Sequence, residues 1–454
     1  MSPSHHKVAI RRGTRREFLN LSGKLAGASA LAGVAIPHVH AAGDGTIRLA
    51  LIGCGGRGSG AVGEALSAPG GPVKLFAMAD LFEDRLKGSY KTLSEQFGKK
   101  IDVPPERQFI GFDAYRKAID CLCPGDVAML TGYTAFRPTQ LDYAVEKGVN
   151  VFMEKPFAPD PAGVRQIIEA GQRAEKKNLK IAAGLMWRHS NARQAMIQRI
   201  RDGGMGQIQL IRAYRMESGY YCGPWNGQGN ELLWQLRRRW AFLWASSGIF
   251  IELMVHQIDE CCWIKDAWPV AAHGVGGRIA GSPECGQNLD SYSIEYTFAD
   301  GTKALVTGRY LPNCHNEFAT YVHGTKCAGQ FCVWGGSPIL TRTYKDQRIA
   351  PDNVDWRSPP EVNPWQMEWN VLLEAIRCDR PHNEARRAAC ADLASIMGRA
   401  AVHSGKVITW DEAMASRFRF CPGVANLTAD SPAPVHADAQ GRYPAPIPGA
   451  CSEI

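Results

Sequence analysis

Short runs of apolar residues alternate with helical spacing over the first half of the chain. Apolar runs of strand length occur at residues 47–52, 73–79, 126–131, 150–154 and 180–184. Apolar positions three and four residues apart predict helices at about residues 59–66, 82–97, 138–147, 160–177 and 189–202. Strands separated by helices are typical of βαβ units, so this half predicts an α/β fold with a Rossmann-type, doubly wound parallel sheet.

Beyond about residue 206, apolar and polar positions alternate, which is typical of antiparallel strands. The alternation predicts strands at residues 207–216, 291–298, 303–310 and 318–323, with a hairpin turn at Asp300-Gly301. Two amphipathic helices follow at residues 363–377 and 386–404. We expect a second, α+β domain with a large, mostly antiparallel open sheet. Too few helices follow to cover both faces of that sheet, which predicts a homodimer or homotetramer.

A chain of 454 residues is too long for one hydrophobic core. The changes in pattern predict four parts: a signal segment over residues 1–42, a Rossmann domain over 43–157, an α+β domain over 158–421 whose C-terminal helices return toward the Rossmann domain, and a Pro/Ala-rich tail of irregular coil over 422–454. The composition is 45% hydrophobic and 21% charged. It excludes a largely disordered chain, a coiled coil and a polytopic membrane protein.

The first 42 residues have the features of an export signal. Thr14-Arg15-Arg16-Glu17-Phe18-Leu19 precedes a weakly apolar run over residues 21–36, and small residues suited to cleavage follow up to Ala42. This combination resembles a twin-arginine signal, which directs folded proteins, often with cofactors bound, to the periplasm or otherwise out of the cytoplasm. A basic tail or an uncleaved anchor is the alternative. We expect the segment to be removed, with no stable membrane insertion afterwards.

The formal net charge of +8 does not indicate a nucleic-acid-binding protein. Six basic residues and one acidic residue among the first 42 account for +5 of this charge, so the rest of the chain is close to neutral. A near-neutral body lacks the basic patch that binding to DNA or RNA requires.

The fourteen cysteines are scattered between Cys54 and Cys451 and do not have the spacing of zinc ligands. We expect most of them to be buried as small hydrophobic residues. The sequence leaves open whether one or two disulfides form, for instance at Cys421 or Cys451.

A glycine-rich loop follows the first predicted strand. Gly53-Cys54-Gly55-Gly56-Arg57-Gly58 matches the G-x-G-x-x-G pattern, with a strand before it and a helix after it. The first glycine permits a tight turn, the second lets the backbone approach a pyrophosphate, and the third lets helix and strand pack closely. Asp80 ends the second strand, where an acid accepts a hydrogen bond from a ribose hydroxyl. The pattern predicts a bound NAD, with NADP disfavoured because Asp80 would repel its phosphate.

Glu154-Lys155-Pro156 ends another predicted strand of the parallel sheet. The carboxyl ends of these strands face the cofactor crevice, so a lysine there can donate to a hydroxyl or carbonyl oxygen of a substrate. Pro156 fixes the backbone after the lysine, and its peptide bond is a candidate for the cis form. The alternative is a surface lysine in a turn.

Together, the glycine loop, the Glu-Lys-Pro motif about a hundred residues later and the antiparallel second domain resemble the Gfo/Idh/MocA family of oxidoreductases. The resemblance covers roughly residues 46–420. Supporting segments lie at residues 184–189 (GLMWRH), 298–302 (FADGT) and 398–410 (GRAAVHSGKVITW). The resemblance implies an NAD(P)-dependent enzyme with a substrate-binding second domain.

In that family a helix of the second domain supplies an acid, a histidine four residues later and often an aspartate three residues beyond. The resemblance assigns these places to Glu252, His256 and Asp259. It implies that His256 accepts the proton of the alcohol, that Glu252 binds hydroxyls or orients the imidazole, and that Asp259 supports His256. A satisfied core histidine and a metal site are the alternatives, and we expect no metal.

Further site residues follow from the same resemblance. Thr131, Glu154 and Lys155 are assigned to the cofactor site, and Arg188 and His189 to the substrate together with Glu252 and Asp259. A His-Trp-His stretch of many members is replaced here by Ala135-Phe136-Arg137. The segment 220–244 is rich in Tyr, Trp and Arg, which suits either stacking on a sugar or an oligomer interface.

These observations predict an exported oxidoreductase that acts on a secondary alcohol of a sugar, polyol or related carbohydrate with tightly bound NAD. Outside the cytoplasm free NAD is not dependably supplied, so the cofactor would be carried and regenerated in place. An NAD-recycling glycosidase, which oxidises, eliminates, adds water and reduces, is the alternative. A catalytically silent binding or assembly protein on the same fold is the third possibility.

Overall fold

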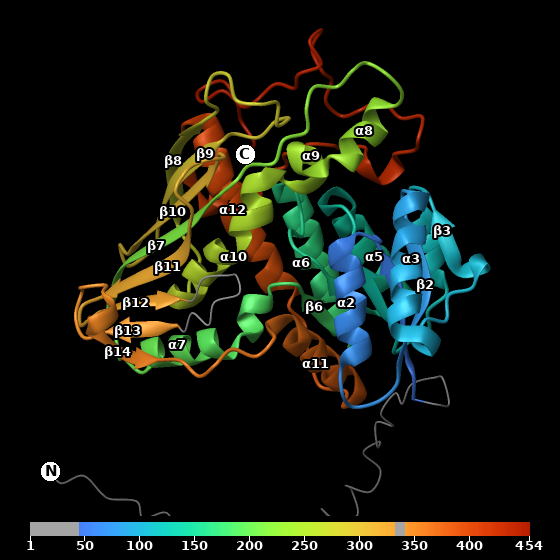
Figure 1. The fold of residues 1–454 in the computed structure, drawn as a ribbon, viewed down its shortest axis with the longest axis horizontal. Coiled ribbons are helices and arrows are strands. Elements are labelled where there is room, and N and C mark those ends of the chain that lie inside the picture. Colours follow the sequence, from blue (N-terminus) through green and yellow to red (C-terminus); the bar gives the residue numbers. More distant parts are fainter. Residues whose placement is uncertain (1–44, 332–340) are drawn as a thin grey trace, which may run out of the picture. The chain divides into compact units, whose positions relative to one another are not determined.

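Our computed structural model describes residues 45–331 and 341–454. The predicted twin-arginine signal lies outside the described residues. A six-stranded parallel sheet forms the core of the first part, with the strand order β3-β2-β1-β4-β5-β6 (Figure 1). Its strands are β1 (Ile47–Ile52), β2 (Val73–Asp80), β3 (Gln108–Ile110), β4 (Val127–Leu130), β5 (Asn150–Met153) and β6 (Ile181–Ala183). This arrangement confirms the predicted doubly wound sheet.

Helices connect these strands on both faces of the sheet. They are α2 (Gly56–Ser67), α3 (Glu83–Phe97), α4 (Ala114–Asp120), α5 (Arg137–Lys147) and α6 (Pro161–Lys176). Local sequence fixes several ends: α5 stops at the left-handed Gly148, and the side chain of Asp160 caps α6 by accepting from the Gly163 N–H. The sheet extends beyond the predicted domain boundary at residue 157, because β6 pairs with β5. Strand β3 was not predicted, since its three residues are too few to show a pattern.

The second sheet has nine strands in the order β14-β13-β12-β11-β7-β10-β9-β8-β15. The bounds of these strands are β7 (Ile208–Glu217), β8 (Ala271–Gly277), β9 (Ser291–Thr297), β10 (Lys303–Tyr310), β11 (Glu317–Gly324), β12 (Ala328–Phe331), β13 (Arg342–Tyr344), β14 (Val354–Arg357) and β15 (Ile408–Thr409). All neighbours are antiparallel except β7 and β10, which are parallel. The mostly antiparallel sheet is therefore confirmed.

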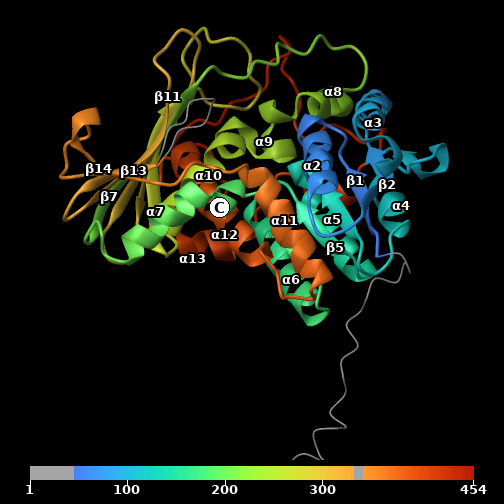
Figure 2. The same ribbon diagram turned by 60° about the horizontal axis from the view of Figure 1, so that its bottom comes forward.

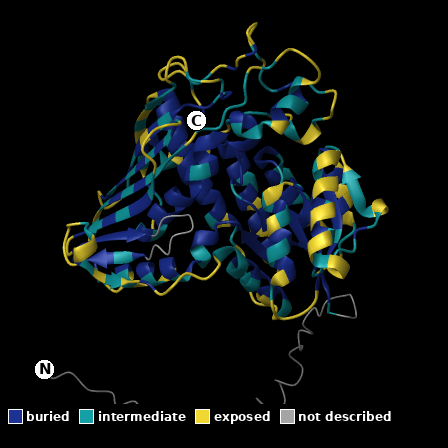
Figure 3. Ribbon diagram, in the orientation of Figure 1, coloured by how far each residue is buried: buried dark blue, intermediate teal, exposed yellow. Residues whose placement is uncertain are grey.

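Two buried helices, α10 (Gly248–Lys265) and α12 (Ala385–Ser404), pack on one face of this sheet (Figures 1 and 3). Strand β10 shows the reason, because its alternate residues from Ala304 to Tyr310 are buried on the face toward the helices, while Leu305, Thr307 and Arg309 are half-exposed. Helix α12 also packs against α6 of the parallel-sheet part, so it belongs to the contact between the two sheets.

One C-terminal helix lies against the Rossmann part. Helix α11 (Pro364–Arg377) packs against α2 (Figure 2). The side chain of Gln366 donates to the carbonyl oxygen of Glu64 at 2.9 Å, and Arg377 donates to that of Gly45 at 3.3 Å. Helix α7 (Asn191–Arg201) and the short 3-10 helix η4 (Met186–His189) also lie where the chain passes from the Rossmann part to the second sheet.

The Tyr/Trp/Arg-rich segment contains α8 (Glu231–Arg237) and α9 (Leu243–Ser246) and packs against the tail. Trp234 stacks on Tyr443 with ring centroids 5.7 Å apart, and the tail itself is irregular apart from one short 3-10 helix. On the other side of the Tyr/Trp/Arg-rich segment, Arg237 pairs with Asp84 at 2.9 Å and lies over the ring of Phe82. This segment therefore covers the β2 end of the Rossmann sheet within its own chain.

Among the described residues, no helix is both long enough and apolar enough to cross a membrane. The cysteines in the same part of the chain, Cys421 and Cys451 included, are all free thiols.

Candidate functional site

The glycine-rich loop between β1 and α2 has space only for glycine at two positions. A Cβ atom at Gly53 would lie 2.4 Å from the main-chain nitrogen of Gly132, and one at Gly58 would lie 2.2 Å from the carbonyl oxygen of Gly53. At Gly55, by contrast, an added Cβ meets nothing within 4 Å. Gly55 is also the N-cap of α2, without a capping side chain. The N–H groups at this helix end therefore face an open cradle that suits a pyrophosphate.

Two predicted residues hold this loop through different groups. Thr131 donates its hydroxyl to the carbonyl oxygen of Gly53 at 2.7 Å, so it supports the turn. The thiol of Cys54 is buried against the carbonyl oxygen of Ala79 at 3.5 Å, which directs it away from the cradle. Its main-chain N–H instead donates to the carboxylate of Asp80 at 2.6 Å. Cys54 thus contributes through its backbone.

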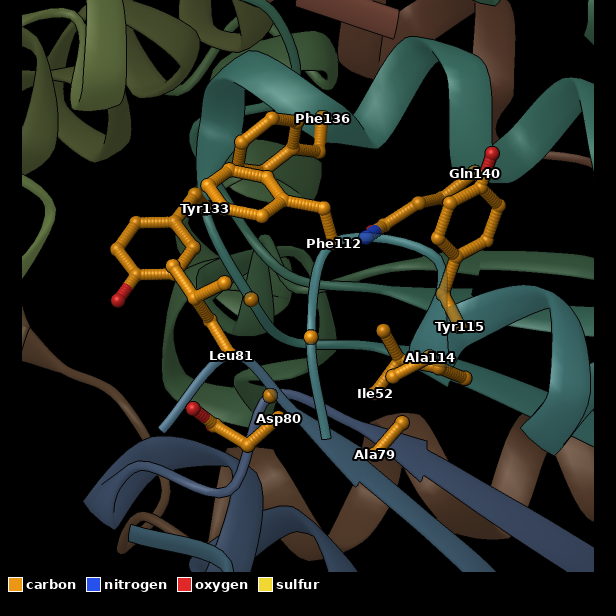
Figure 4. A pocket seen from close by; sticks show the side chains of 13 residues that line it. Ile52, Ala79, Asp80, Leu81, Phe112, Ala114, Tyr115, Tyr133, Phe136 and Gln140 are labelled. Atoms are coloured by element: carbon orange, nitrogen blue, oxygen red, sulfur yellow. The ribbon is translucent and has the colours of Figure 1, made fainter. Parts of the chain in front are cut away.

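Asp80 stands at the carboxyl end of β2, as the sequence predicted for the ribose-binding acid. Its second oxygen accepts from the N–H of Phe82 at 2.8 Å, and burial raises the pKa of the carboxyl group. Asp80 lines a small pocket at the carboxyl ends of the strands, together with Gly53 and Tyr133. Figure 4 shows Asp80 and Leu81 on one side of this pocket and the rings of Phe112, Tyr133 and Phe136 on the other.

The pocket wall is aromatic, and it replaces the His-Trp-His stretch that the resemblance led one to expect. Phe136 makes edge-to-face contacts with Phe112 and Tyr133, with ring centroids 6.0 and 5.9 Å apart. Such a wall suits packing against a flat, apolar ring system. The pocket adjoins Gly53 and Asp80, so its position and chemistry fit the adenosine half of a dinucleotide.

Arg57 does not face the cradle, although it lies in the glycine loop. Its guanidinium pairs with Glu64 and, at 2.9 Å, with the buried carboxylate of Glu154. Glu154 in turn packs on Gly184, where a Cβ would lie 2.7 Å from its carboxylate. Arg57 was predicted as a cofactor-binding residue of the loop, and its side chain is engaged in neutralising Glu154.

Sequence analysis did not identify Glu368 of α11 as a candidate site residue. Its side chain is fully buried, and both carboxyl oxygens lack a hydrogen-bond partner within the described ranges. Burial, and after it the charge of Glu154, raise the pKa of Glu368 well above its usual value. The amphipathic pattern of the helix gave no signal, since a glutamate there is expected to face solvent.

Lys155 extends from the end of β5 to the helix of the second domain. Its amine donates to the carbonyl oxygen of Glu252 at 2.7 Å and lies 3.4 Å from the carboxylate of the same residue. The Lys155–Pro156 peptide bond is cis, in agreement with the sequence-based expectation. The structure thus brings together two of the predicted catalytic residues from different domains.

His256 lies one helical turn after Glu252 and is 6% exposed. Its ring lies 5.3 Å from the ring of Trp187, and its Nδ1 atom has no hydrogen-bond partner in the part of the chain that the structure describes. Burial lowers the pKa of the imidazole well below its usual value, and the charges of Lys155, Arg215 and Arg193 lower it further. Burial and these charges therefore favour the neutral form of the ring, whose unpartnered Nδ1 atom is itself buried.

Asp259 does not support His256, contrary to the expectation from the resemblance. Its two carboxylate oxygens accept from Nε and Nη2 of Arg188, both at 2.8 Å. Arg188 also lies over the ring of Trp263. The pair is bidentate and largely buried, so both predicted substrate-binding side chains are engaged with each other.

His189 likewise faces a protein carboxylate. Its Nε2 atom lies 3.7 Å from Glu384, near the start of α12. The predicted contact of His189 with substrate therefore lacks support in the structure, which places its ring between η4 and α12.

Two buried charged residues that the sequence did not single out as functional hold the backbone after Lys155. Arg137 donates to the carbonyl oxygens of Leu130 at 3.2 Å and Gly132 at 2.7 Å, and also to that of Pro156. Asp392 of α12 accepts from the N–H groups of Phe157 and Ala158 at 2.5 and 2.7 Å. For Asp392 the available signal was a carboxylate among the alanines of a predicted helix, because such a group needs a buried partner.

Within residues 45–331 and 341–454, no group of three or more His, Cys, Asp or Glu side chains is placed to hold a metal ion. The chemistry of the described site is that of a lysine, a neutral imidazole and a carboxylate beside a dinucleotide-binding loop.

Comparison with models of protein families gives no match, and neither does comparison with curated proteins. Solved structures do match. The aldose–aldose oxidoreductase of Caulobacter crescentus, complexed with glycerol, superposes with a TM-score of 0.62 at 18% identity, over 80% of this chain and 99% of that one. The myo-inositol 2-dehydrogenase of Lactobacillus plantarum gives 0.59 at 20% identity, over 80% and 99%. The scyllo-inositol dehydrogenase of Lactobacillus casei, with bound NAD(H) and scyllo-inositol, gives 0.60 at 18%, over 81% and 99%.

These similarities define the class of fold. The chain has the fold of the Gfo/Idh/MocA-type oxidoreductases, whose solved members include inositol dehydrogenases and an aldose–aldose oxidoreductase. At the level of the fold, the resemblance seen in the sequence is confirmed.

Proposed function

We propose that this protein is an exported, NAD-dependent oxidoreductase that acts on a secondary alcohol of a sugar, polyol or related carbohydrate. One observation carries the proposal: Lys155, at the end of a Rossmann strand, reaches Glu252 on the helix that also bears a neutral, buried His256. Proton-handling groups thus meet at the carboxyl ends of the strands, on the same side of the sheet as the glycine loop. The similar solved structures are sugar and polyol oxidoreductases, which supports the same substrate class.

The residues divide the chemistry between them. A bound nicotinamide would supply the hydride acceptor. The amine of Lys155 donates to the oxygen of the reacting alcohol, while the neutral imidazole of His256 takes up its proton. The Glu252 carboxylate is left to accept hydrogen bonds from neighbouring hydroxyls. Burial keeps the imidazole of His256 in the neutral form that can accept a proton, while the same burial and the neighbouring positive charges make the resulting imidazolium less stable.

NAD rather than NADP is the proposed cofactor, because the carboxylate of Asp80 lies beside the pocket where a ribose would bind. A negative group there accepts from a hydroxyl and repels a phosphate.

Tight retention is supported by the segment 220–244 and the tail, which pack over Phe82 and Tyr133 at the edge of that pocket. Retention suits export through the twin-arginine route, which we propose from residues 1–42.

We also propose a homodimer or homotetramer through the nine-stranded sheet. Helices α10 and α12 cover one face, whereas residues of β7, β9 and β10 that point to the other face are half-exposed. Analytical ultracentrifugation at micromolar concentration should show an oligomer, and a monomer alone would contradict this part of the proposal. No observation in the structure favours the glycosidase route, so it is not proposed.

The test of the main proposal starts from purified full-length protein. After denaturation, mass spectrometry should detect NAD in the released small molecules, and sugars and polyols should then be screened for oxidation. Lys155→Met should abolish most activity, while the matched control Lys74→Met, on the half-exposed surface of β2, should not. Oxidation of no sugar or polyol by protein loaded with NAD would contradict the proposed function.

A further inference from the structure

Arg399 of α12 is fully buried, and each end of its guanidinium holds a different part of the chain. Its Nη2 donates to the carbonyl oxygen of Pro159 at 3.0 Å, and its Nη1 donates to that of Ser247 at 3.0 Å. Pro159 lies in the turn that follows Lys155, and Ser247 directly precedes α10. One side chain therefore ties the catalytic turn to the start of the helix that bears Glu252 and His256.

The start of α10 has a conformation that its surroundings must hold. Ser247 has a φ of +76°, in the left-handed region that residues other than glycine rarely adopt. Besides the bond from Arg399 to its carbonyl, its hydroxyl donates to the carbonyl oxygen of Ala158 at 3.2 Å. Such a backbone persists only where neighbouring contacts over-determine it. A loss of the Arg399 contact would release both Ser247 and the turn at Ala158.

Glu453 holds Arg399 in place. Its side chain comes from the tail, is almost fully buried, and accepts from Nε of Arg399 at 2.8 Å. Although burial raises the pKa of the Glu453 carboxyl group, the charges of Arg399 and His403 outweigh it and lower the pKa to about 2. The carboxylate is therefore ionised and compensates a guanidinium that water does not reach.

A second route leads from Glu453 to the same helix. Its other oxygen lies 2.6 Å from Nδ1 of His403, whose Nε2 lies 3.0 Å from the hydroxyl of Tyr292. The ring of Tyr292 stacks on Phe250 of α10 with centroids 4.4 Å apart. Both carboxylate oxygens of Glu453 thus connect to the start of α10, one through Arg399 to Ser247 at its N-cap and the other through His403 and Tyr292 to Phe250 in its first turn.

We propose that Glu453 is a positioning residue of the active site, which fixes Lys155 relative to Glu252 and His256 through Arg399 and through His403 and Tyr292. The proposal relies on the proposed function only for the statement that these three residues form the active site. Without its carboxylate, Arg399 would be a buried charge without compensation and would turn toward other acceptors, which loosens the bond from the Lys155 amine to the Glu252 carbonyl.

The test uses the full chain and a readout independent of turnover. The protein is acylated with a trace of acetic anhydride, and the modified peptides are measured by mass spectrometry. This gives the reactivity of the Lys155 amine relative to that of a more exposed lysine amine. In Glu453→Gln this reactivity should rise roughly tenfold, since a charge-assisted hydrogen bond is lost. Lys74 serves as the internal reference, and Ser452→Ala is the matched control because its exposed hydroxyl contacts only Ile454 within the tail.

Turnover gives the second readout. On a polyol or sugar that the wild-type protein oxidises, Glu453→Gln should lower kcat with little change in KM, because substrate contacts persist while the proton-handling groups are misplaced. Glu453→Asp keeps the charge but is one methylene shorter, so it should give an intermediate Lys155 reactivity. If Glu453→Gln does not fold, Glu453→Asp tests the positioning role of Glu453 in its place.

The outcomes separate the two proposals. Wild-type reactivity of Lys155 in folded Glu453→Gln, or in Glu453→Asp if only that variant folds, would overturn the role of Glu453 even if the enzyme oxidises polyols. Raised Lys155 reactivity in a protein that oxidises no carbohydrate would support the positioning role and contradict the proposed function.

Discussion

The amine of Lys155 lies 2.7 Å from the carbonyl oxygen of Glu252, so the end of a Rossmann strand is bonded directly to a helix of the second domain. His256 follows one helical turn later and is buried against Trp187. A substrate that reaches these groups must lie between the two domains. This relationship is the basis of the predictions that concern catalysis.

Lys155 and His256 should act as one unit. Lys155→Met and His256→Ala should each lower turnover on the order of 10²–10⁴-fold, the range typical of general acid–base groups. The double variant should lose much less than the product of the two losses, because groups acting together are not additive. Steady-state kinetics on one polyol, with Lys74→Met as the control, checks this. Fully multiplicative losses would show that the two residues act independently.

Asp80→Ala should weaken retention of NAD and reduce its preference over NADP. A hydrogen bond to a charged acceptor contributes roughly 1.5–3 kcal/mol, which corresponds to a dissociation constant raised about 10- to 100-fold. Isothermal titration of protein stripped of cofactor measures both dinucleotides. Glu83→Ala, at an exposed position three residues along, is the control. Tighter binding of NADP than NAD by the unaltered protein would place Asp80 away from the ribose.

Asp259→Asn should destabilise the fold rather than alter the proton uptake of His256. The carboxylate of Asp259 is committed to Arg188 in a largely buried, bidentate pair, and removing one partner of such a pair costs about 3–5 kcal/mol. Urea denaturation should show this loss, whereas the pH profile of turnover should keep its wild-type midpoint. A shifted midpoint with unchanged stability would restore the role that the family resemblance had implied.

Asp392 makes stability depend on pH. Burial raises the pKa of its carboxyl group to about 7, whereas in the unfolded chain an aspartate ionises at about pH 4. Between these values the folded protein binds one proton more than the unfolded chain, so the free energy of unfolding falls as pH rises, by on the order of 4 kcal/mol. Asp392→Asn cannot ionise and should lack this loss.

Urea denaturation at several pH values from about 4 to 8 measures this dependence. Asp113→Asn, at an exposed position, is the matched control and should keep the wild-type slope. An equal slope in Asp392→Asn and in the wild-type protein would show that the carboxyl group does not hold a proton in the folded state.

The sequence predicted the fold well because its signals are local. Buried parallel strands need consecutive apolar residues, and antiparallel strands need alternation, so β1 and β10 could both be recognised. The glycine loop was equally clear, since Gly53 and Gly58 are required by clashes that any side chain would make. Family resemblance rather than pattern located Glu252 and His256, because α10 is buried on all sides and has no amphipathic face.

Partners of charged side chains could not be predicted from spacing. The family resemblance implied that Asp259 supports His256, three residues away on the same helix, yet Arg188 from another element takes the carboxylate. Arg57 turned from the cradle to Glu154 for the same reason, because a buried acid requires a nearby cation. Such pairings depend on tertiary packing between segments up to about a hundred residues apart, which periodicity does not encode.

The most direct test of the proposed function is a single-turnover experiment on protein loaded with NAD. On mixing with an excess of a sugar or polyol, the absorbance of reduced nicotinamide should rise in the wild-type protein and in Lys74→Met, and should rise at least a hundredfold more slowly in Lys155→Met. Equal rates in the wild-type protein and Lys155→Met, or no reduction of the bound NAD by any sugar or polyol, would contradict the account.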